Sequence, residues 1–422
     1  IEEFKILHER LSSDLDPRPQ LVISNGTCGQ ASGSNDLIRI AKKVLIQQNL
    51  TGKIGLNVTG CHGFCETEPS ILVEPQRTFY PRVDPADIPR IIESVVHGDV
   101  VEDLLYRDPV SRERIEKQDD IPFYKHQDRV LLSKSEKIDP IRIFNYIRNG
   151  GYTAFCKLYE STEPEAVVEA VKTSGLRGRG GAGFPTGLKW ELLSKQSSKG
   201  GKVLICNADE GDPGAYMDRS LLEGNPHSII EGMLIGALAT GATEGIIYVR
   251  NEYPLAIKHL TIALRQAREM NFLGYNIMSK PFSFDISVVR GAGAFVCGEE
   301  TSLIRSIEGR MGEPRQRPPF PIERGLSGKP TAINNVETWA NIPVVFSLGA
   351  EEYAKIGTPG NSGTKIFSLV GKVKNTGLVE VPMGTTINEI VYDIGGGSSS
   401  NAKIMAVQTG GPSGGCIPAD KF

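Results

Sequence analysis

The chain has 422 residues, and its 47 Lys and Arg against 50 Asp and Glu give a formal net charge of −3, which gives no support for a nucleic-acid-binding or polybasic membrane surface. Its composition, 39% hydrophobic and 23% charged, is that of a globular protein with length for about three domains, and no apolar run approaches the roughly 18–20 residues of a membrane span. Seven cysteines, an odd number, favour free or metal-binding thiolates in a reducing cytoplasm over a disulfide framework.

Residues 1–85 alternate strand and helix signals. Three short apolar segments predict strands, at residues 21–23, 54–58 and 71–73. The amphipathic segment 35–48 predicts a helix capped by Asn35. A C-x-x-x-C turn, Cys61 to Cys65, follows the second strand. This order is typical of a thioredoxin-like ferredoxin domain.

Residues 86–142 are polar and charged, with alternating signs from Arg112 to Asp120. This composition predicts a linker that runs over the surface. One short helix, residues 88–96, is predicted within it.

From residue 143 to about 350, strand and helix signals alternate. Strands are predicted at residues 203–206, 246–249 and 286–289, and helices at 226–241, 253–271 and 299–308. Strands separated by helices predict a parallel sheet covered by helices. After residue 364 the pattern changes to short strands around glycines, at residues 366–370, 379–381 and 404–407.

The segment 174–190, SGLRGRGGAGFPTGLKW, is rich in glycine and basic residues and contains no acid. Glycine backbones approach a ligand closely and aim several N–H groups at one phosphate. Charge comes from Arg177, Arg179 and Lys189, and Phe184 offers a face for stacking a flat ring. The segment contains G-x-G-x-x-G, but that fingerprint requires a preceding strand, and residues 164–171 have a helical pattern. The loop therefore predicts a nucleotide cradle other than the usual Rossmann turn.

Three further motifs follow in order: CNADEGDPGAYMDRSLLEGNPH at 206–227, GAGAFVCGEETSLIRSIEGR at 291–310 and NNVET at 334–338. With the glycine-rich loop, they resemble the NADH-oxidising flavoprotein subunit of respiratory complex I. They are more similar still to the diaphorase (beta) subunits of multimeric NAD-linked [FeFe]-hydrogenases and formate dehydrogenases, which the thioredoxin-like extension also favours. The resemblance runs from about Phe144 to the end of the chain.

The resemblance implies an α/β protein with three domains. These are a thioredoxin-like [2Fe–2S] ferredoxin-type domain at 1–85, a parallel-sheet FMN/NADH-binding domain of non-standard Rossmann-like type at 143–350, and a β-grasp (ubiquitin-like) domain at 360–422, with the linker at 86–142. FMN and NADH would share one cavity, and hydride transfer is the cofactors' own chemistry, so no general acid or base is predicted.

Each chemical group of the two cofactors would be bound by protein side chains of a particular type. A phosphate needs N–H donors and a cation, which Asn334, Asn335 and Lys189 offer, and ribityl hydroxyls need acceptors such as Asn207 and Asp209 after a strand. In the family, the glycine-rich loop cradles NADH, the phenylalanine matching Phe184 stacks on it, and acids near the ribose favour NAD over NADP. Two alternatives remain: residues 207–210 form a turn with Asx caps, and Phe320 makes a packing contact. The predicted cofactor-binding residues are Gly178, Arg179, Gly180, Gly181, Gly183, Phe184, Lys189, Asn207, Asp209, Glu210, Asp212 (Glu in complex I relatives), Gly298, Glu299, Glu300, Phe320, Asn334, Asn335 and Thr338.

Three cysteines, Cys28, Cys61 and Cys65, resemble part of the C-x4-C…C-x3-C motif that holds a [2Fe–2S] cluster. Cys28 has no cysteine partner at the x4 spacing, and Ser24 lies one residue off that position. Either these three cysteines, with an oxygen from Ser24, are metal ligands, or the domain has lost its cluster and serves in docking. The other cysteines, Cys156, Cys206, Cys297 and Cys416, are interpreted as packing residues.

Family members also carry a C-x-x-C-x-x-C motif for a [4Fe–4S] cluster after the β-grasp domain. This chain has no such motif, begins with Ile1 and ends at Phe422, so we expect a portion of a longer polypeptide with that domain downstream.

The predicted function is that of an FMN-dependent NADH:acceptor oxidoreductase, a diaphorase subunit that passes single electrons to iron–sulfur clusters of a larger complex. Its predicted partners are a thioredoxin-like [2Fe–2S] electron-transfer subunit and a catalytic hydrogenase or formate dehydrogenase subunit. Two alternatives are a cofactor-less scaffold that retains the fold and a binding-only NADH sensor.

Overall fold

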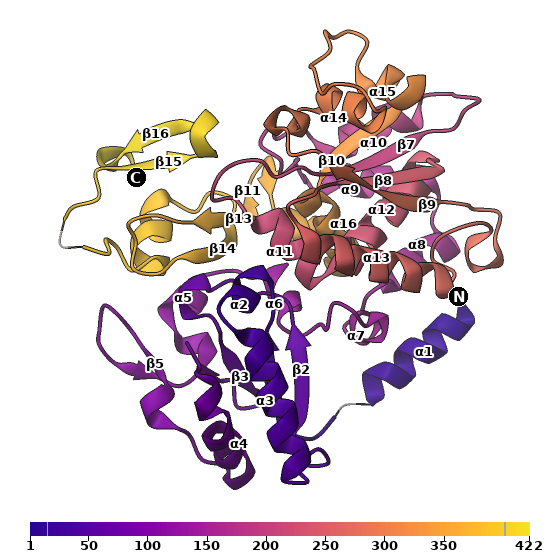
Figure 1. Cartoon of the computed structure of the whole chain (residues 1–422). Coiled ribbons are helices and arrows are strands. Elements are labelled where there is room, and N and C mark those ends of the chain that lie inside the picture. The colour runs from indigo at the N-terminus through magenta and orange to yellow at the C-terminus, as the bar shows by residue number, and fades with distance from the viewer. Residues whose placement is uncertain (15, 401) are drawn as a thin grey trace.

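The structure, a computed structural model, describes residues 1–14, 16–400 and 402–422. Figure 1 shows an N-terminal unit at the lower left, a larger α/β unit at the upper right and a C-terminal unit at the upper left. We define these units by their sheets: residues 20–98, 143–348 and 357–422, respectively.

The N-terminal unit is built on a four-stranded sheet of order β2-β1-β3-β4. Strand β1 is parallel to β2 and antiparallel to β3, which in turn pairs with β4. Alternate residues of β1 serve different cores: Leu21 and Ile23 pack with helices α3 and α4, whereas Val22 faces the opposite side. The bounds are β1 Gln20–Ser24, β2 Gly55–Thr59, β3 Ile71–Glu74, β4 Thr78–Tyr80, α2 Thr27–Ala31, α3 Ser34–Gln47 and α4 Ile88–His97.

Two details differ from the predictions. Helix α3 begins at Ser34 with Gly33 at its N-cap, so Asn35 is not the cap. Helix α4 was predicted as part of a linker, but Ile88, Ile91 and Ile92 are fully buried in the core of the N-terminal unit. A polar sequence around a short apolar stripe gave no indication of which surface that stripe would cover.

The second face of the N-terminal sheet is covered by the C-terminal unit. Val22 and Phe79 share a core with Phe123 and with Val379 and Val381 of strand β14. Residues 99–142 connect the N-terminal unit to the α/β unit through short helices and strands. These are β5 Tyr106–Arg107, β6 Arg114–Ile115, α5 Pro122–Lys125 and α6 Leu132–Ser135. The N-terminal sheet is therefore buried on both faces.

The α/β unit contains a fully parallel sheet of order β10-β7-β8-β9. Its two faces have separate cores: Leu204 and Cys206 of β7 pack with helices α8 to α13 and α16, and Val203 and Ile205 pack with α14. The predicted helix-covered parallel sheet is confirmed. The bounds are β7 Val203–Ala208, β8 Glu244–Arg250, β9 Asp285–Gly291, β10 Thr331–Asn335, α7 Ile143–Arg148, α8 Thr153–Ser161, α9 Pro164–Thr173, α10 Thr186–Ser194, α11 Met217–Gly224, α12 Pro226–Thr240, α13 Pro254–Glu269, α14 Glu300–Ile307, α15 Pro321–Arg324, α16 Val336–Leu348 and α17 Ala350–Ala354.

The C-terminal unit contains three antiparallel pairs. They are β11 Gly357–Thr358 with β12 Asn361–Ser362, β13 Thr364–Leu369 with β14 Gly377–Pro382, and β15 Ala406–Thr409 with β16 Gly415–Pro418. In the described chain these pairs form separate two-stranded sheets and not one continuous sheet.

Helix α1, Glu2–Ser13, lies apart from the N-terminal unit. It packs against α7, and Phe4 belongs to the large core of the α/β unit. The chain thus begins on the α/β unit before it enters the N-terminal unit.

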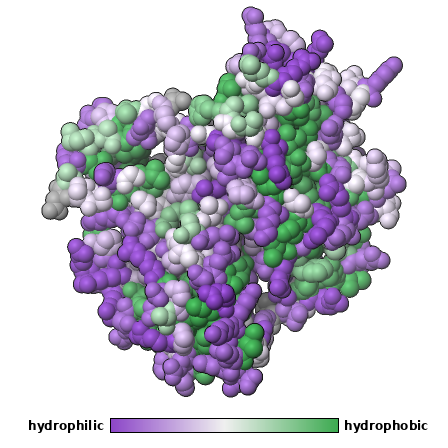
Figure 2. Space-filling model, in the orientation of Figure 1, coloured by the Kyte–Doolittle hydropathy of each residue, from purple (hydrophilic) through white to green (hydrophobic). Residues whose placement is uncertain are grey.

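The surface view agrees with this division. Figure 2 shows hydrophilic residues over most of the N-terminal unit on this face, with hydrophobic residues gathered on the α/β unit and around β15 and β16. Within the described residues, no helix combines the length and apolarity required to cross a membrane.

Candidate functional site: a cofactor cavity at the edge of the parallel sheet

The strand order of the α/β unit marks one position as a ligand site. From β7 the chain moves to β8 and β9 on one side, whereas β10 returns to the other side of β7. In open parallel sheets, ligands bind outside the carboxyl ends of the strands where the order reverses in this way. The reversal lies between β7 and β10, which end at Ala208 and Asn335.

The glycine-rich loop connects two helices above this position. Helix α9 precedes it, with Glu163 at its N-cap, and α10 follows it, so the prediction of a helix before the loop is confirmed. The loop is closed at its base, where Gly178 N donates to Phe184 O at 2.9 Å. Gly181 and Gly183 have φ of 107° and 62°, values that side-chain-bearing residues rarely adopt.

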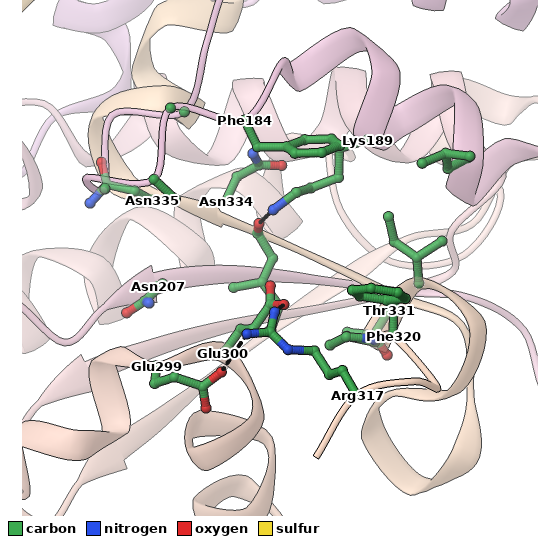
Figure 3. Close-up of a pocket in the computed structure, with 18 of the residues that line it drawn as sticks. Phe184, Lys189, Asn207, Glu299, Glu300, Arg317, Phe320, Thr331, Asn334 and Asn335 are labelled. Carbon is green, nitrogen blue, oxygen red and sulfur yellow. Dashed lines mark hydrogen bonds and ion pairs between the residues drawn. The ribbon is translucent and has the colours of Figure 1, made fainter. Parts of the chain in front are cut away.

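A cavity of about 580 Å³ lies between the loop and the sheet edge. Twelve of the predicted cofactor-binding residues line it: Gly178, Gly180, Gly183, Phe184, Lys189, Asn207, Gly298, Glu299, Glu300, Phe320, Asn334 and Asn335. Figure 3 shows Phe184 and Lys189 on one side and Glu299, Glu300 and Arg317 on the other. The sequence motifs thus meet around one hollow.

Charges of both signs face each other across the cavity. Lys189 Nζ donates to Ile333 O at 2.9 Å, and burial lowers the pKa of this amine. On the other side, Arg317 pairs with Glu300 at 2.7 Å and approaches Glu299 at 3.8 Å. Glu299 also caps α14 by accepting from Thr301 N and Ser302 N; burial raises its pKa, but these hydrogen bonds and Arg317 lower it overall.

The strand ends contribute amides. Asn207 Nδ2 donates to Gly298 O at 2.9 Å, and Asn334 Oδ1 accepts from Trp190 Nε1 at 3.2 Å. Asn335 caps α16 through Glu337 N, and its Nδ2 donates to Asp218 at 2.6 Å. These bonds fix the three amides around the entrance to the β7–β10 crevice.

Six predicted residues do not line the cavity. Arg179 points away: its guanidinium donates to the carbonyls of Ser362 and Thr364, and its N–H donates to Thr338 Oγ1. The guanidinium of Arg179 and the hydroxyl of Thr338 are therefore both hydrogen-bonded within the chain. The others are Gly181 at the loop tip, Glu210 bonded to the first N–H groups of α11, Asp212 beside Gly411, and Asp209 below Gly298.

Asp209 differs from the other five because both of its carboxylate oxygens are buried without a partner, whereas Asp212 has one such oxygen. Among the described residues, neither of its oxygens has a hydrogen-bond partner, although the residue is only 8% exposed. Burial raises its pKa to about 6, and Arg250 opposes that change. A buried acceptor of this kind is stabilised by a ligand that donates to it.

Sequence reasoning missed part of the lining. The most important omission is Arg317, which follows α14 in a loop and pairs with two predicted acids. The positive charge of Arg317 in the segment RQRPPFP could have indicated a binding residue, but nothing in the sequence indicates that this loop lies over the sheet. The other missed residues are Ala182, Leu192, Gln196, Pro321, Ile322, Glu323, Thr331 and Ile333.

The three cysteines of the predicted metal site lie together where the N-terminal unit meets α11. However, no group of three or more Cys, His, Asp or Glu in the described parts of the chain is arranged to hold a metal ion. Ser24 does not supply an oxygen: it is fully buried, and its hydroxyl donates to Glu68 at 2.5 Å. The assignment of these three cysteines as metal ligands therefore stays a prediction.

Comparison with known proteins shows to which family the chain belongs. The Nuo51 FMN-binding domain matches residues 171–344. A subunit of NADH-quinone oxidoreductase from Rhizobium meliloti is 43% identical over 289 residues, which cover 68% of each chain. The chain belongs to the same family as this NADH-quinone oxidoreductase subunit. The predicted relationship to the complex I flavoprotein is confirmed.

Hydrogenase relatives extend this result. NADP-reducing hydrogenase subunit HndC of Solidesulfovibrio fructosivorans is 53% identical over 294 residues, 69% of this chain and 59% of that protein. A crystal structure of NAD+-reducing [NiFe]-hydrogenase in the H2-reduced state is similar over 98% of this chain and 68% of that chain, with 30% identity and a TM-score of 0.59. An SLBB domain matches residues 366–417. The chain spans about three fifths of the length of HndC.

Proposed function

We propose that this chain is an NADH-oxidising flavoprotein subunit that exchanges hydride between NAD(H) and FMN and delivers electrons to iron–sulfur partners. The observation that best supports this proposal is the cavity between β7 and β10, where the strand order reverses. A glycine-rich loop, a cation, two aromatic rings and a pair of acids all line it. The FMN-binding family match supports the same cofactor.

The residues present fit FMN. Asn334, Asn335 and Lys189 line the cavity and offer donors for a phosphate. Next to the lining residue Gly298, the unpaired carboxylate of Asp209 offers an acceptor for a hydroxyl or ring N–H. The loop also approaches closely, because a Cβ on Gly180 would lie 3.1 Å from Asn335 Cβ. When bound, FMN supplies the two-electron acceptance and one-electron release that amino-acid side chains lack. The protein's own contribution is to orient the two cofactors and exclude water.

The outer half of the cavity fits a dinucleotide. Phe184 and Phe320 are 41% and 51% exposed, so their faces remain free to stack on flat rings. Glu300 is placed to accept from ribose hydroxyls, and its charge would repel a 2′-phosphate. Arg317, paired to Glu300, offsets part of that repulsion. We therefore propose NADH as the substrate, with the Glu300–Arg317 pair setting the preference over NADPH.

This assignment predicts the effect of Glu300→Gln, which keeps size but removes charge. We expect KM for NADH to rise by about tenfold or more, since a hydrogen bond to a charged group contributes about 1.5–3 kcal/mol, and discrimination against NADPH to fall. Steady-state dye reduction with both nucleotides measures this. Glu313→Gln is the control, because Glu313 pairs with Arg305 outside the cavity. An unchanged NADH-to-NADPH ratio in Glu300→Gln would remove this role.

The decisive experiment for the function is the flavin content of the purified chain. Acid release should yield about one FMN per chain, identified by fluorescence and chromatography, and NADH should bleach the bound flavin. Complete absence of FMN after expression with excess riboflavin would leave the cofactor-less scaffold. Bound FMN that NADH does not reduce would indicate a binding-only role.

Two finer structural assignments belong to the same proposal. The mixed sheet β2-β1-β3-β4 with helices α3 and α4 supports a thioredoxin-like N-terminal unit, and the SLBB match supports a β-grasp C-terminal unit. For partners, we infer a [2Fe–2S] electron-transfer subunit and a catalytic subunit of the hydrogenase or formate dehydrogenase type. Relatives named as hydrogenases support the former type of complex.

A further inference from the structure

Asn335 is held at both ends of its side-chain amide. Its Oδ1 accepts from Glu337 N at 2.9 Å, and its Nδ2 donates to Asp218 Oδ2 at 2.6 Å. A backbone N–H can only donate, so the atom that faces it is the amide oxygen, and the orientation of the amide is fixed. An amide nitrogen carries two protons, and among the described residues Nδ2 makes no second hydrogen bond. One N–H of Asn335 is therefore left for a ligand in the cavity that this residue lines (Figure 3).

Asp218 does not reach the cavity itself. It lies in the first turn of α11, is 5% exposed and is not among the described residues that line the cavity. Its backbone N–H donates to Glu210 Oε1 at 3.1 Å, which fixes it to the loop after β7. The contact of Asp218 with the cavity is therefore indirect, through Asn335.

An acid next to a phosphate donor requires a physical reason, because an ionised carboxylate would repel the phosphate. Burial, and then the neighbouring carboxylate of Glu210, raise the pKa of Asp218 well above its usual range, against the charge of Lys365. These surroundings favour the neutral carboxyl group, whose carbonyl oxygen still accepts a hydrogen bond from Nδ2 of Asn335. Asp218 can therefore orient the amide while adding little negative charge beside an anion.

We propose that Asp218 is a positioning residue for the phosphate of FMN, because it holds the Asn335 amide in the orientation that leaves one N–H of Nδ2 available to that group. This inference rests on the proposed FMN-binding function and deepens it. Asn335 supplies the contact with the ligand, and Asp218 acts through Asn335. Loss of Asp218 should therefore weaken binding of the phosphate and leave binding of the flavin ring unchanged.

The test compares FMN with riboflavin, which has the same ring and ribityl chain but no phosphate. Each is titrated into the flavin-free full chain, and binding is followed by the quenching of flavin fluorescence. The ratio of the two dissociation constants measures the contribution of the phosphate. We expect Asp218→Ala to weaken FMN binding by about tenfold or more, the usual effect of losing a hydrogen bond to a charged group, with little change for riboflavin.

Three further variants separate positioning from a general structural role. Asp218→Asn keeps an acceptor oxygen at the same size and should retain most of the FMN affinity. In an Asn335→Ala background, Asp218→Ala should cause no further loss of FMN affinity, since the two residues act as a unit. Glu223→Ala is the matched control, because Glu223 is a buried acid on the same helix whose partner is Thr27 of the N-terminal unit. It should leave the riboflavin-to-FMN ratio unchanged.

The possible failures are distinguishable. If the wild-type chain binds no FMN, the proposed function fails and this inference fails with it. If the wild type binds FMN, a wild-type riboflavin-to-FMN ratio in Asp218→Ala would overturn the positioning role alone. Equal losses of FMN and riboflavin affinity, or additive effects of the Asp218 and Asn335 substitutions, would also overturn it. Asp218→Leu, which fills the space without an acceptor, gives the same comparison if the alanine variant does not fold.

Discussion

Gly183 is a residue of the glycine-rich loop that lines the cavity and has a positive φ. Its φ of 62° lies in the left-handed region, which a β-branched side chain adopts only with strain of about 1–3 kcal/mol. No atom lies within 4 Å of a Cβ placed there, so the new side chain would project into open space at the cavity.

We therefore expect Gly183→Val to abolish NADH-dependent dye reduction while the protein remains folded. Gly52→Val is a control, because Gly52 also has open space around its Cβ but has an ordinary φ and lies far from the loop in sequence. Circular dichroism confirms folding of both variants. Wild-type activity in folded Gly183→Val would contradict the position of the nucleotide.

Glu68 gives a pH dependence that is separable from the cavity. Burial raises its pKa to about 8, against the hydrogen bonds from Ser24 and Ser70. A carboxyl whose folded pKa exceeds its unfolded value of about 4.5 stabilises the fold fully below that value, and the contribution is lost as pH rises from about 4.5 to 8. The loss is at most about 1.4 kcal/mol per pH unit.

We expect Glu68→Gln to gain thermal stability relative to the wild type as pH rises from 5 to 8. The difference between their unfolding midpoints, measured by circular dichroism at both pH values, isolates this residue from other buried acids. Parallel midpoints at the two pH values would show that Glu68 does not titrate in this range.

For single residues, the sequence predicted which residues lie near the cavity better than it predicted where their side chains point. The motifs identified Phe184, Lys189 and Glu300 because each needed only proximity to a glycine-rich loop or a strand end. Arg179 does not line the cavity, because its side chain donates to two carbonyls of the C-terminal unit, nearly two hundred residues later in the chain. Such a contact has no signal in local composition.

Among the elements, α11 and the turn after β2 make a very close backbone approach between units. A Cβ on Gly60 would lie 2.4 Å from Gly224 Cα, well below any ordinary contact. The contact is reinforced by Gly60 N, which donates to Ser135 O, and by Thr27, whose N–H and hydroxyl both donate to Glu223. This contact depends on glycine at this position because a backbone cannot move aside as a side chain can.

Gly60→Ala should therefore separate the two units locally and destabilise the protein by about 1–3 kcal/mol, the usual effect of overpacking. Thermal unfolding and the rate of limited proteolysis measure the change. Gly52→Ala, in the loop before β2, should leave both unchanged. Equal stability of Gly60→Ala and wild type would show that the units do not meet at this glycine.

Element prediction succeeded where apolar periodicity was strong. The strands of residues 203–206 and 246–249 and the helix from Pro226 were confirmed, because long buried runs leave a clear pattern. Strand β10 was missed, since Thr331–Asn335 contains only Ala332 and Ile333 as apolar residues. Its amides Asn334 and Asn335 were nevertheless found from their motif, so the site was predicted without the strand that positions it.

For the whole molecule, α1 makes the N-terminus part of the α/β unit. Phe4 is 7% exposed, and its ring meets that of Phe272 edge-on, with centroids 5.6 Å apart. The prediction that residues 1–85 belong together missed this, because an amphipathic helix does not encode which core its stripe will cover.

Phe4→Ala should lower the stability of the protein by about 3 kcal/mol, as expected for a buried Phe→Ala change. Ile6→Ala on the same helix is a matched control, because Ile6 is 61% exposed. Thermal unfolding followed by circular dichroism compares the two. Equal midpoints would show that α1 is not docked on the α/β unit.

The two tryptophans of the chain, Trp190 and Trp339, are both buried in the α/β unit, with ring centroids 5.6 Å apart. Their indole N–H groups donate to Asn334 and to the carbonyl of Ile205, below the cavity. The protein consequently has an intrinsic optical reporter confined to one unit. Tryptophan emission should be quenched by energy transfer when a yellow chromophore occupies the cavity. It should not change while the N-terminal unit unfolds.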